Sequence, residues 1–171
     1  MHFDKNLAFG PKYLPSCGKA QVQSDDTKCK KGSKIGTGSA QGVALGATEN
    51  LTVTAYNGAA SKSNSANRWF YLHVEGSSPL VIDSVIAATL TKATGDYGYK
   101  LVVPIPANLV QPLAGVTATL LNFSTSVSGT AKGLPYIGIK GCSGGKLKFK
   151  GTFLYTDGTS KTATDTAACK K

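Results

Sequence analysis

Arginine and histidine are scarce in this sequence. Of its 19 basic residues only Arg68 is an arginine, and there are two histidines. Sequence-specific contacts to nucleic acids rely chiefly on the planar guanidinium group of arginine, whereas lysine acts as a hydrated point charge. The net charge of +10 therefore indicates solubility or a general attraction to polyanions. No sequence-specific nucleic-acid partner is predicted.

The scarcity of histidine also limits catalysis and metal binding. Residues 141–145 (Gly-Cys-Ser-Gly-Gly) match the Gly-x-Ser-x-Gly elbow of hydrolases, but no histidine follows His73, and we expect a strand after the motif where an elbow needs a helix. We interpret the motif as a turn. The nine acidic residues form no calcium-loop pattern, although a glycosidase pair that meets only in three dimensions stays open. The sequence thus predicts no catalytic residue, no metal site and no cofactor.

Long apolar runs are absent as well. No segment approaches the roughly 20 apolar residues of a membrane-spanning helix, so no membrane span is predicted. Residues 1–5 also lack the apolar segment of a signal peptide. We expect that a leader has been removed, because the cysteines described next indicate a protein located outside the cytoplasm.

The four cysteines form two separated groups. Cys17 and Cys29 are 12 residues apart, Cys142 and Cys169 are 27 apart, and neither spacing is that of a zinc-binding doublet. His2 and His73 flank neither group. Four cysteines allow three disulfide pairings, of which the sequence-local one is the simplest. Oxidised pairs predict a secreted or cell-surface protein, and the alternative is a cytosolic protein with four free thiols.

The residues that are abundant indicate an all-β fold. The chain has 20 glycines and 7 prolines, and Val, Ile, Thr and Tyr recur in short runs typical of strands. We predict one domain over 1–171, an antiparallel β-sandwich of about eight or nine strands. Residues 1–42 are expected to be an irregular segment pinned by a disulfide, and 43–171 to carry the strands, the first of which begins within 39–45. The further strands are expected at 50–56, 68–75, 80–91, 99–105, 116–127, 136–140, 147–155 and 160–167.

Two dipeptides predict tight turns, because glycine adopts positive φ at little cost. Asp157-Gly158 lies between two strand patterns and predicts a hairpin, and Asn57-Gly58 predicts a turn after 50–56. No convincing helix is expected. Only 80–93 has a pattern in which a helix competes with a strand.

Aromatic residues suggest one candidate ligand-binding surface. If 68–75 is a strand, Trp69, Tyr71, His73 and Glu75 share one face. A row of this kind can stack on sugar rings while the carboxylate accepts hydrogen bonds from hydroxyl groups. The competing and favoured interpretation buries Trp69, because the only tryptophan of a sandwich usually lies between its sheets.

Lysines suggest a second candidate surface. Lys146, Lys148 and Lys150 alternate with apolar residues and share one face of the expected strand. Such a row can bind a polysaccharide or an anionic cell-wall polymer. The favoured alternative is a solvated face that keeps the sheet from pairing with other sheets.

A series of short motifs resembles a family of secreted, largely uncharacterised actinobacterial proteins. The motifs occur in the order of that family, at residues 29–40 (Cys-Lys-Lys-Gly-Ser-Lys-Ile-Gly-Thr-Gly-Ser-Ala), 54–58, 72–76, 104–106, 148–153 and 155–158, and end at Cys169. The resemblance covers roughly residues 14 to 171. It implies secretion and a β-rich fold with two bridged cysteine pairs, and it implies no activity. Members of the family usually carry a signal peptide and a preceding strand segment that this sequence lacks, so either the leader was trimmed or an edge of the sheet is missing. In the second case the first regular strand, expected near residue 39, would leave an unpaired sheet edge.

These observations lead to two main functional hypotheses. The first is a non-enzymatic structural or adhesive module of the cell surface or of an extracellular assembly, which associates with a homo-oligomer or filament neighbour through its sheet edges. The alternative is a carbohydrate-binding module that uses the aromatic row and the lysine row. An enzyme is a third possibility, for which the sequence shows no acid pair.

Overall fold

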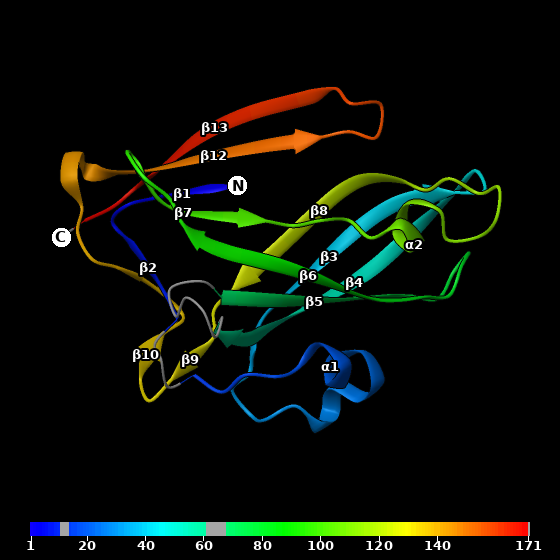
Figure 1. Ribbon diagram of the computed structural model, residues 1–171, viewed down its shortest axis with the longest axis horizontal. Coiled ribbons are helices and arrows are strands. Elements are labelled where there is room, and N and C mark those ends of the chain that lie inside the picture. The colour runs from blue at the N-terminus through cyan, green and yellow to red at the C-terminus, as the bar shows by residue number, and fades with distance from the viewer. Residues whose placement is uncertain (11–13, 61–67, 171) are drawn as a thin grey trace.

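The computed structural model describes residues 1–10, 14–60 and 68–170 and places nine strands in one antiparallel, curled sheet (Figure 1). The strand order is β13-β12-β1-β7-β6-β5-β4-β3-β8. These strands are β1 (His2–Asp4), β3 (Lys34–Ala44), β4 (Ala47–Ala60), β5 (Arg68–Gly76), β6 (Ile82–Lys92), β7 (Tyr97–Val102), β8 (Thr119–Val127), β12 (Lys146–Leu154) and β13 (Ser160–Ala168). Two small sheets pair β2 (Leu7–Phe9) with β11 (Ile137–Ile139) and β9 (Thr130–Ala131) with β10 (Leu134–Pro135).

The all-β, antiparallel and sandwich-like fold is confirmed. Each strand range expected from the sequence overlaps one observed strand. Residues 80–93, where a helix was the alternative to a strand, contain β6. The main core contains the apolar side chains of one face of the curled sheet. Phe70, Leu72 and Val74 of β5 lie in it, together with the fully buried Ile35 and Tyr136. Alternation along β5 thus separates Phe70, Leu72 and Val74 from the row that begins at Trp69, as expected.

The expectation that residues 1–42 are irregular is wrong. This segment contains β1, β2, the helix α1 (Lys19–Asp25) and the 3-10 turn η1 (Asp26–Lys28), and β3 begins at Lys34, before residue 39. Three-residue strands such as β1 and β2 are too short to show alternation. They are stabilised by pairing with distant partners, because β1 lies between β7 and β12 and β2 pairs with β11.

The structure also contains two helices that the sequence did not predict. In α1 only Val22 is fully buried, and it packs against Tyr56 and Val85 on the second face of the sheet. One buried residue gives no helical periodicity to detect. The second helix, α2 (Ala107–Val110), is a single turn. Among the described residues neither helix has the length and apolarity that crossing a membrane requires.

Both sequence-local disulfides are present. Cys17 and Cys29 are bridged with their Cα atoms 5.4 Å apart, and Cys142 and Cys169 with theirs 5.8 Å apart. The first bridge encloses α1 and η1. The second joins the residues that precede β12 and follow β13, and so closes the base of the C-terminal hairpin. The two bridges are consistent with an extracellular location.

Of the two predicted turns, one is confirmed. Gly158 has a φ of 83° in the turn between β12 and β13, where Asp157 Oδ1 accepts a hydrogen bond of 2.8 Å from the amide of Thr159. The prediction of a turn at Asn57-Gly58 is wrong, because β4 continues through these residues to Ala60. Glycine at position 58 instead allows the backbone of β4 to pack closely against Trp69, because an added Cβ would lie 2.7 Å from the Cβ of Trp69.

The short strand β1 joins the C-terminal hairpin to the rest of the sheet. It pairs with β12 on one side and with β7 on the other. Asp4, at its end, is 4% exposed, and its carboxylate accepts hydrogen bonds from the amide of Asn6 at 2.8 Å and from the amide of Lys148 at 3.0 Å. Burial acts to raise the pKa of Asp4, but these hydrogen bonds outweigh it and hold that pKa below its usual range.

Asp4→Ala should lower the free energy of unfolding by about 1–3 kcal/mol, because it leaves two backbone donors without their acceptor. Urea denaturation followed by circular dichroism measures this change. Asp96→Ala is the matched control, because Asp96 pairs with the side chain of the same Lys148 at 3.0 Å but on the exposed surface. An equal loss of stability in both variants would show that the buried carboxylate of Asp4 has no special role.

Candidate functional site

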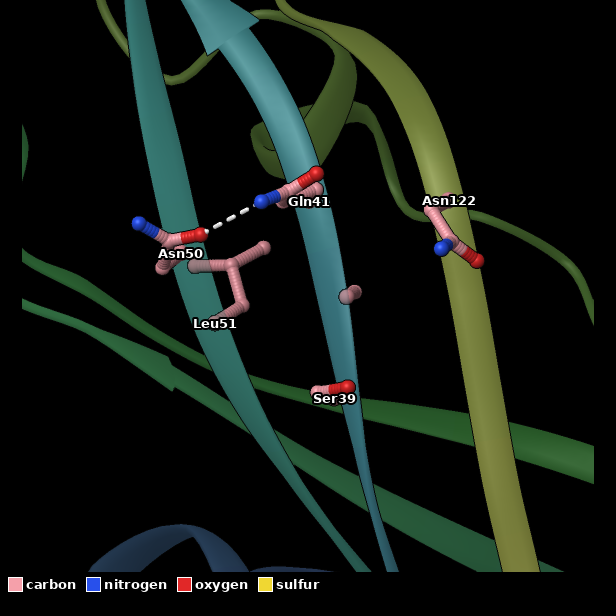
Figure 2. Close-up of a pocket in the computed structure, with 6 residues that line it drawn as sticks. Ser39, Gln41, Asn50, Leu51 and Asn122 are labelled. Atoms are coloured by element: carbon pink, nitrogen blue, oxygen red, sulfur yellow. Dashed lines mark hydrogen bonds between the residues drawn. The ribbon is translucent and has the colours of Figure 1, made fainter.

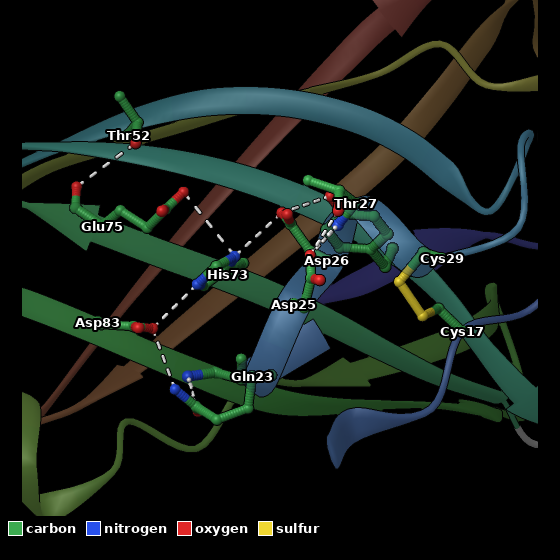
Figure 3. A network of polar contacts seen from close by, with 12 residues as sticks. Cys17, Gln23, Asp25, Asp26, Thr27, Cys29, Thr52, His73, Glu75 and Asp83 are labelled. Atoms are coloured by element: carbon green, nitrogen blue, oxygen red, sulfur yellow. Dashed lines mark hydrogen bonds and ion pairs between the residues drawn. A yellow bond between two sulfur atoms is a disulfide. The ribbon is translucent and has the colours of Figure 1, made fainter. Parts of the chain in front are cut away.

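The packing of α1 against the sheet brings four ionisable side chains together, which we call the acid–histidine cluster (Figure 3). Its members are Asp26, His73, Glu75 and Asp83. Asp26 opens η1 directly after α1, His73 and Glu75 lie two residues apart on β5, and Asp83 is on β6. Residues far apart in the chain are thus joined because α1 covers the second face of β5 and β6.

His73 is the centre of this cluster and is 6% exposed. Its Nδ1 lies 3.2 Å from Asp26 Oδ2 and 3.8 Å from Glu75 Oε2, and its Nε2 lies 3.0 Å from Asp83 Oδ1. Burial acts to lower the pKa of His73, but the hydrogen bonds to Asp83 and Asp26 outweigh it and raise that pKa. The imidazolium form is therefore stabilised in the folded chain.

The Asp26 carboxylate has a second partner in Tyr56. The Tyr56 hydroxyl donates a hydrogen bond of 2.7 Å to Asp26 Oδ2. This bond and the neighbouring His73 hold the pKa of Asp26 below its usual range, although burial acts to raise it. In turn, burial and the hydrogen bond to Asp26 raise the pKa of Tyr56. Asp26 is consequently an ionised acceptor fixed between two side chains of the sheet.

The cluster also has the composition of a cation site. One ligand atom from each of Asp26, His73 and Glu75 lies within 4.8 Å of the others. His73 and Asp26 are the inner members, with side chains 7% and 27% exposed, whereas Glu75 is 51% exposed. The cluster therefore faces solvent on the Glu75 side.

The aromatic row predicted on β5 shares one face, as expected, but it forms no open platform. Trp69 is 38% exposed, so its expected burial between sheets is wrong. Tyr71 packs against the buried apolar group beneath α1 that includes Val22 and Val85, and burial raises the pKa of its hydroxyl. His73 is bonded to acidic side chains and is buried. The reason is α1, which occupies the face on which a sugar ring would have to stack.

The lysine row lies elsewhere on the sheet. Lys146 and Lys148 are exposed on β12 and Lys150 is partly buried. Lys148 Nζ pairs with Asp96 Oδ2 at 3.0 Å. Strands β1, β7 and β6 lie between β12 and β5. The two candidate surfaces are therefore separate and do not combine into one ligand site.

The residues that match the hydrolase elbow form a turn. Ser143–Gly145 is the 3-10 turn η2, which leads directly into β12, and the preceding Cys142 is in the second disulfide. The Ser143 hydroxyl accepts a hydrogen bond of 3.1 Å from the side-chain amide of Asn6. This contact ties the turn to the loop between β1 and β2.

The outermost strand β8 is the second candidate site. Within the residues that the structure describes it pairs with β3 alone, so one side of its backbone is unpaired. Its nine residues, Thr-Leu-Leu-Asn-Phe-Ser-Thr-Ser-Val, include no charge, proline or glycine. Leu120, Leu121 and Phe123 are 55%, 59% and 42% exposed. Phe123 stands opposite Ala40, a core residue, so the apolar face extends to this edge.

A row of amide side chains crosses the sheet to the same edge (Figure 2). Asn50 of β4, Gln41 of β3 and Asn122 of β8 are partners in register. Gln41 Nε2 donates a hydrogen bond of 2.9 Å to Asn50 Oδ1, and all three side chains line a pocket together with Ser39. The row reaches the unpaired side of the sheet at Asn122.

The sequence placed His73 and Glu75 on one face of a strand but did not indicate Asp26 or Asp83 as partners of His73. Asp26 lies in the segment that was expected to be irregular and pinned by a disulfide, and Asp83 is one of the nine acids that form no calcium-loop pattern. Asp26 is 47 positions from His73 in the sequence and Asp83 is 10. No spacing rule relates them, and only their convergence on one imidazole reveals the cluster.

Comparisons of the chain with protein-family models, curated proteins and solved structures found no match.

The raised pKa of His73 predicts a pH dependence of stability. A histidine whose pKa is higher in the folded chain contributes its full stabilisation below the unfolded pKa of about 6.5, and this is lost as the pH rises through the folded value. The difference in free energy of unfolding between the wild type and His73→Gln should therefore be largest below about pH 6.5 and shrink as the pH rises above it. Denaturation in buffers that contain a chelator measures it.

His2→Gln provides the control for this comparison. Burial and nearby positive charges lower the pKa of His2, so its difference from the wild type should change with pH in the opposite direction. A pH-independent difference for His73→Gln would contradict the charge assigned to His73.

Proposed function

We propose that this chain is a non-enzymatic structural module of an extracellular assembly, and that it joins neighbouring copies by strand pairing at β8. The single observation that carries the proposal is the exposed, uncharged edge of β8. An edge strand offers a row of unpaired backbone N–H and C=O groups to another chain. Natural proteins usually block such edges with charges, prolines or bulges. β8 has no charge or proline, and its one irregularity is the register shift at Leu121.

The opposite edge of the sheet, formed by β13, differs from β8 in a way that supports the proposal. β13 is also paired on one side only among the described residues, and all nine of its residues are exposed. It carries Lys161 and Asp165, whose charges oppose uncontrolled pairing. The two edges thus differ chemically, and β8 is the one without a blocking charge.

Side chains at the β8 edge also fit an added strand. Leu120 and Phe123 would lose exposed apolar area against a neighbouring strand, at about 25 cal/mol per Å². Asn122 would extend the amide row to a fourth strand, in the manner of the amide ladders that stabilise stacked sheets. Strand addition of this kind obtains affinity from backbone hydrogen bonds and specificity from side chains.

The extracellular part of the proposal is supported by the two disulfides. Membership of the actinobacterial family that the motifs resemble belongs to the same proposal and would imply secretion. The family resemblance led us to expect an unpaired edge near β3. The structure places β3 between β4 and β8 instead, so the proposed edge is β8.

Sedimentation velocity over a concentration series tests the proposal. In about 0.15 M salt, which screens the net positive charge beyond roughly 8 Å, the average mass of the wild type should rise above that of one chain. Leu121→Lys places a charge on the pairing edge and should keep the chain monomeric. Thr164→Lys is the matched control, since it adds the same charge to an exposed residue of β13.

The two variants separate pairing at β8 from other association. Wild type and Thr164→Lys should self-associate alike while Leu121→Lys does not. A monomeric wild type at every concentration, or equal effects of both substitutions, would contradict the proposal.

A further inference from the structure

We propose that Asp26, His73 and Glu75 form a binding site for a divalent transition-metal ion of the zinc type. The site uses His73 Nδ1 and one carboxylate oxygen from each acid. It is independent of the pairing edge on β8, and it goes beyond the sequence-based prediction of no metal site.

Distances between the candidate ligand atoms fit such an ion. Zinc binds imidazole nitrogen and carboxylate oxygen at about 2.0–2.2 Å, which places neighbouring ligands of a tetrahedral site about 3.3 Å apart. His73 Nδ1 lies 3.2 Å from Asp26 Oδ2 and 3.8 Å from Glu75 Oε2. Small rotations of the exposed Glu75 side chain would complete the approach.

Both inner ligands have the supporting contacts that metal ligands require. A metal-binding histidine usually donates its other ring N–H to a carboxylate, which fixes the tautomer, and binding carboxylates are themselves hydrogen-bonded. Here Asp83 Oδ1 lies 3.0 Å from His73 Nε2, so Nε2–H can donate to it and leave the lone pair of Nδ1 free. The Tyr56 hydroxyl donates to Asp26. Gln23 on α1 in turn donates a 3.0 Å hydrogen bond to Asp83 and holds it in place.

The charge of the cluster favours a cation even though the chain is basic. The carboxylates of Asp26, Glu75 and Asp83 surround one imidazole, so three negative charges and one positive charge leave an excess of two negative charges. Metal binding would displace the Nδ1 proton of His73. The ion would then neutralise carboxylates that in its absence face the imidazolium.

The open side of the cluster leaves room for further ligands. The side chains of Glu75 and Asp83 are 51% and 57% exposed, so the ion is approached from solvent. Three protein ligands with one open position leave that position for water or for a donor from another molecule.

Isothermal titration calorimetry of the metal-stripped, disulfide-intact chain with Zn²⁺ tests the proposal. One ion should bind per chain, and binding should release a proton, seen as a dependence of the heat on the ionisation enthalpy of the buffer. Glu75→Gln and His73→Gln should each weaken binding by tenfold or more. Asp83→Asn should weaken it about 10- to 100-fold through the tautomer of His73.

Controls separate this site from other zinc ligands. His2→Gln removes the only other histidine and should leave the affinity unchanged, and Ca²⁺ should bind far more weakly because it prefers six to eight oxygen ligands. Glu75→Gln alters an exposed side chain, so its test holds even if His73→Gln does not fold. No zinc binding by the wild type, or equal affinity in wild type and Glu75→Gln, would overturn the proposal.

Discussion

The continuity of the sheet depends on the three residues of β1. Without β1 the order β13-β12-β1-β7 would break, and the C-terminal hairpin would have no partner in the main sheet. Side-chain packing reinforces the backbone pairing, since the ring of Phe3 lies 5.1 Å from that of Phe9 and 6.2 Å from that of Phe149. The buried Asp4 adds the hydrogen bond that ties β1 to β12. One short strand therefore connects two parts of the molecule.

The two faces of the sheet have different roles because different segments cover them. One face encloses the main apolar core, which includes Tyr136, whose hydroxyl donates a 3.3 Å hydrogen bond to the buried Asn57. On the other face α1 covers β5 and β6 and creates a polar environment around His73. The edge at β8 belongs to neither covering segment and remains exposed. The apolar core, the acid–histidine cluster and the edge proposed for association thus lie on separate surfaces of one sheet.

The sequence predicted those features that local patterns determine. Strand ranges and the turn at Gly158 follow from alternation and from the conformational freedom of glycine, and both disulfides matched the sequence-local pairing. Features that depend on distant partners were missed. A strand as short as β1 carries no pattern of its own, α1 buries only Val22, and Asp26 reaches His73 only because Cys17–Cys29 and α1 position it. The turn predicted at Asn57-Gly58 was wrong because glycine is also required where the backbone packs closely against a side chain, here that of Trp69.

The position of β1 has a consequence for the order of folding. The hydrogen bond from Lys148 to Asp4 spans 144 residues of sequence. Contacts of such length slow folding, because the chain must close a large loop before they form. During synthesis β1 can pair with β7 as soon as β7 has emerged, whereas its second side stays unpaired until β12 has been made. The C-terminal hairpin therefore joins the main sheet beside a strand that is synthesised long before it.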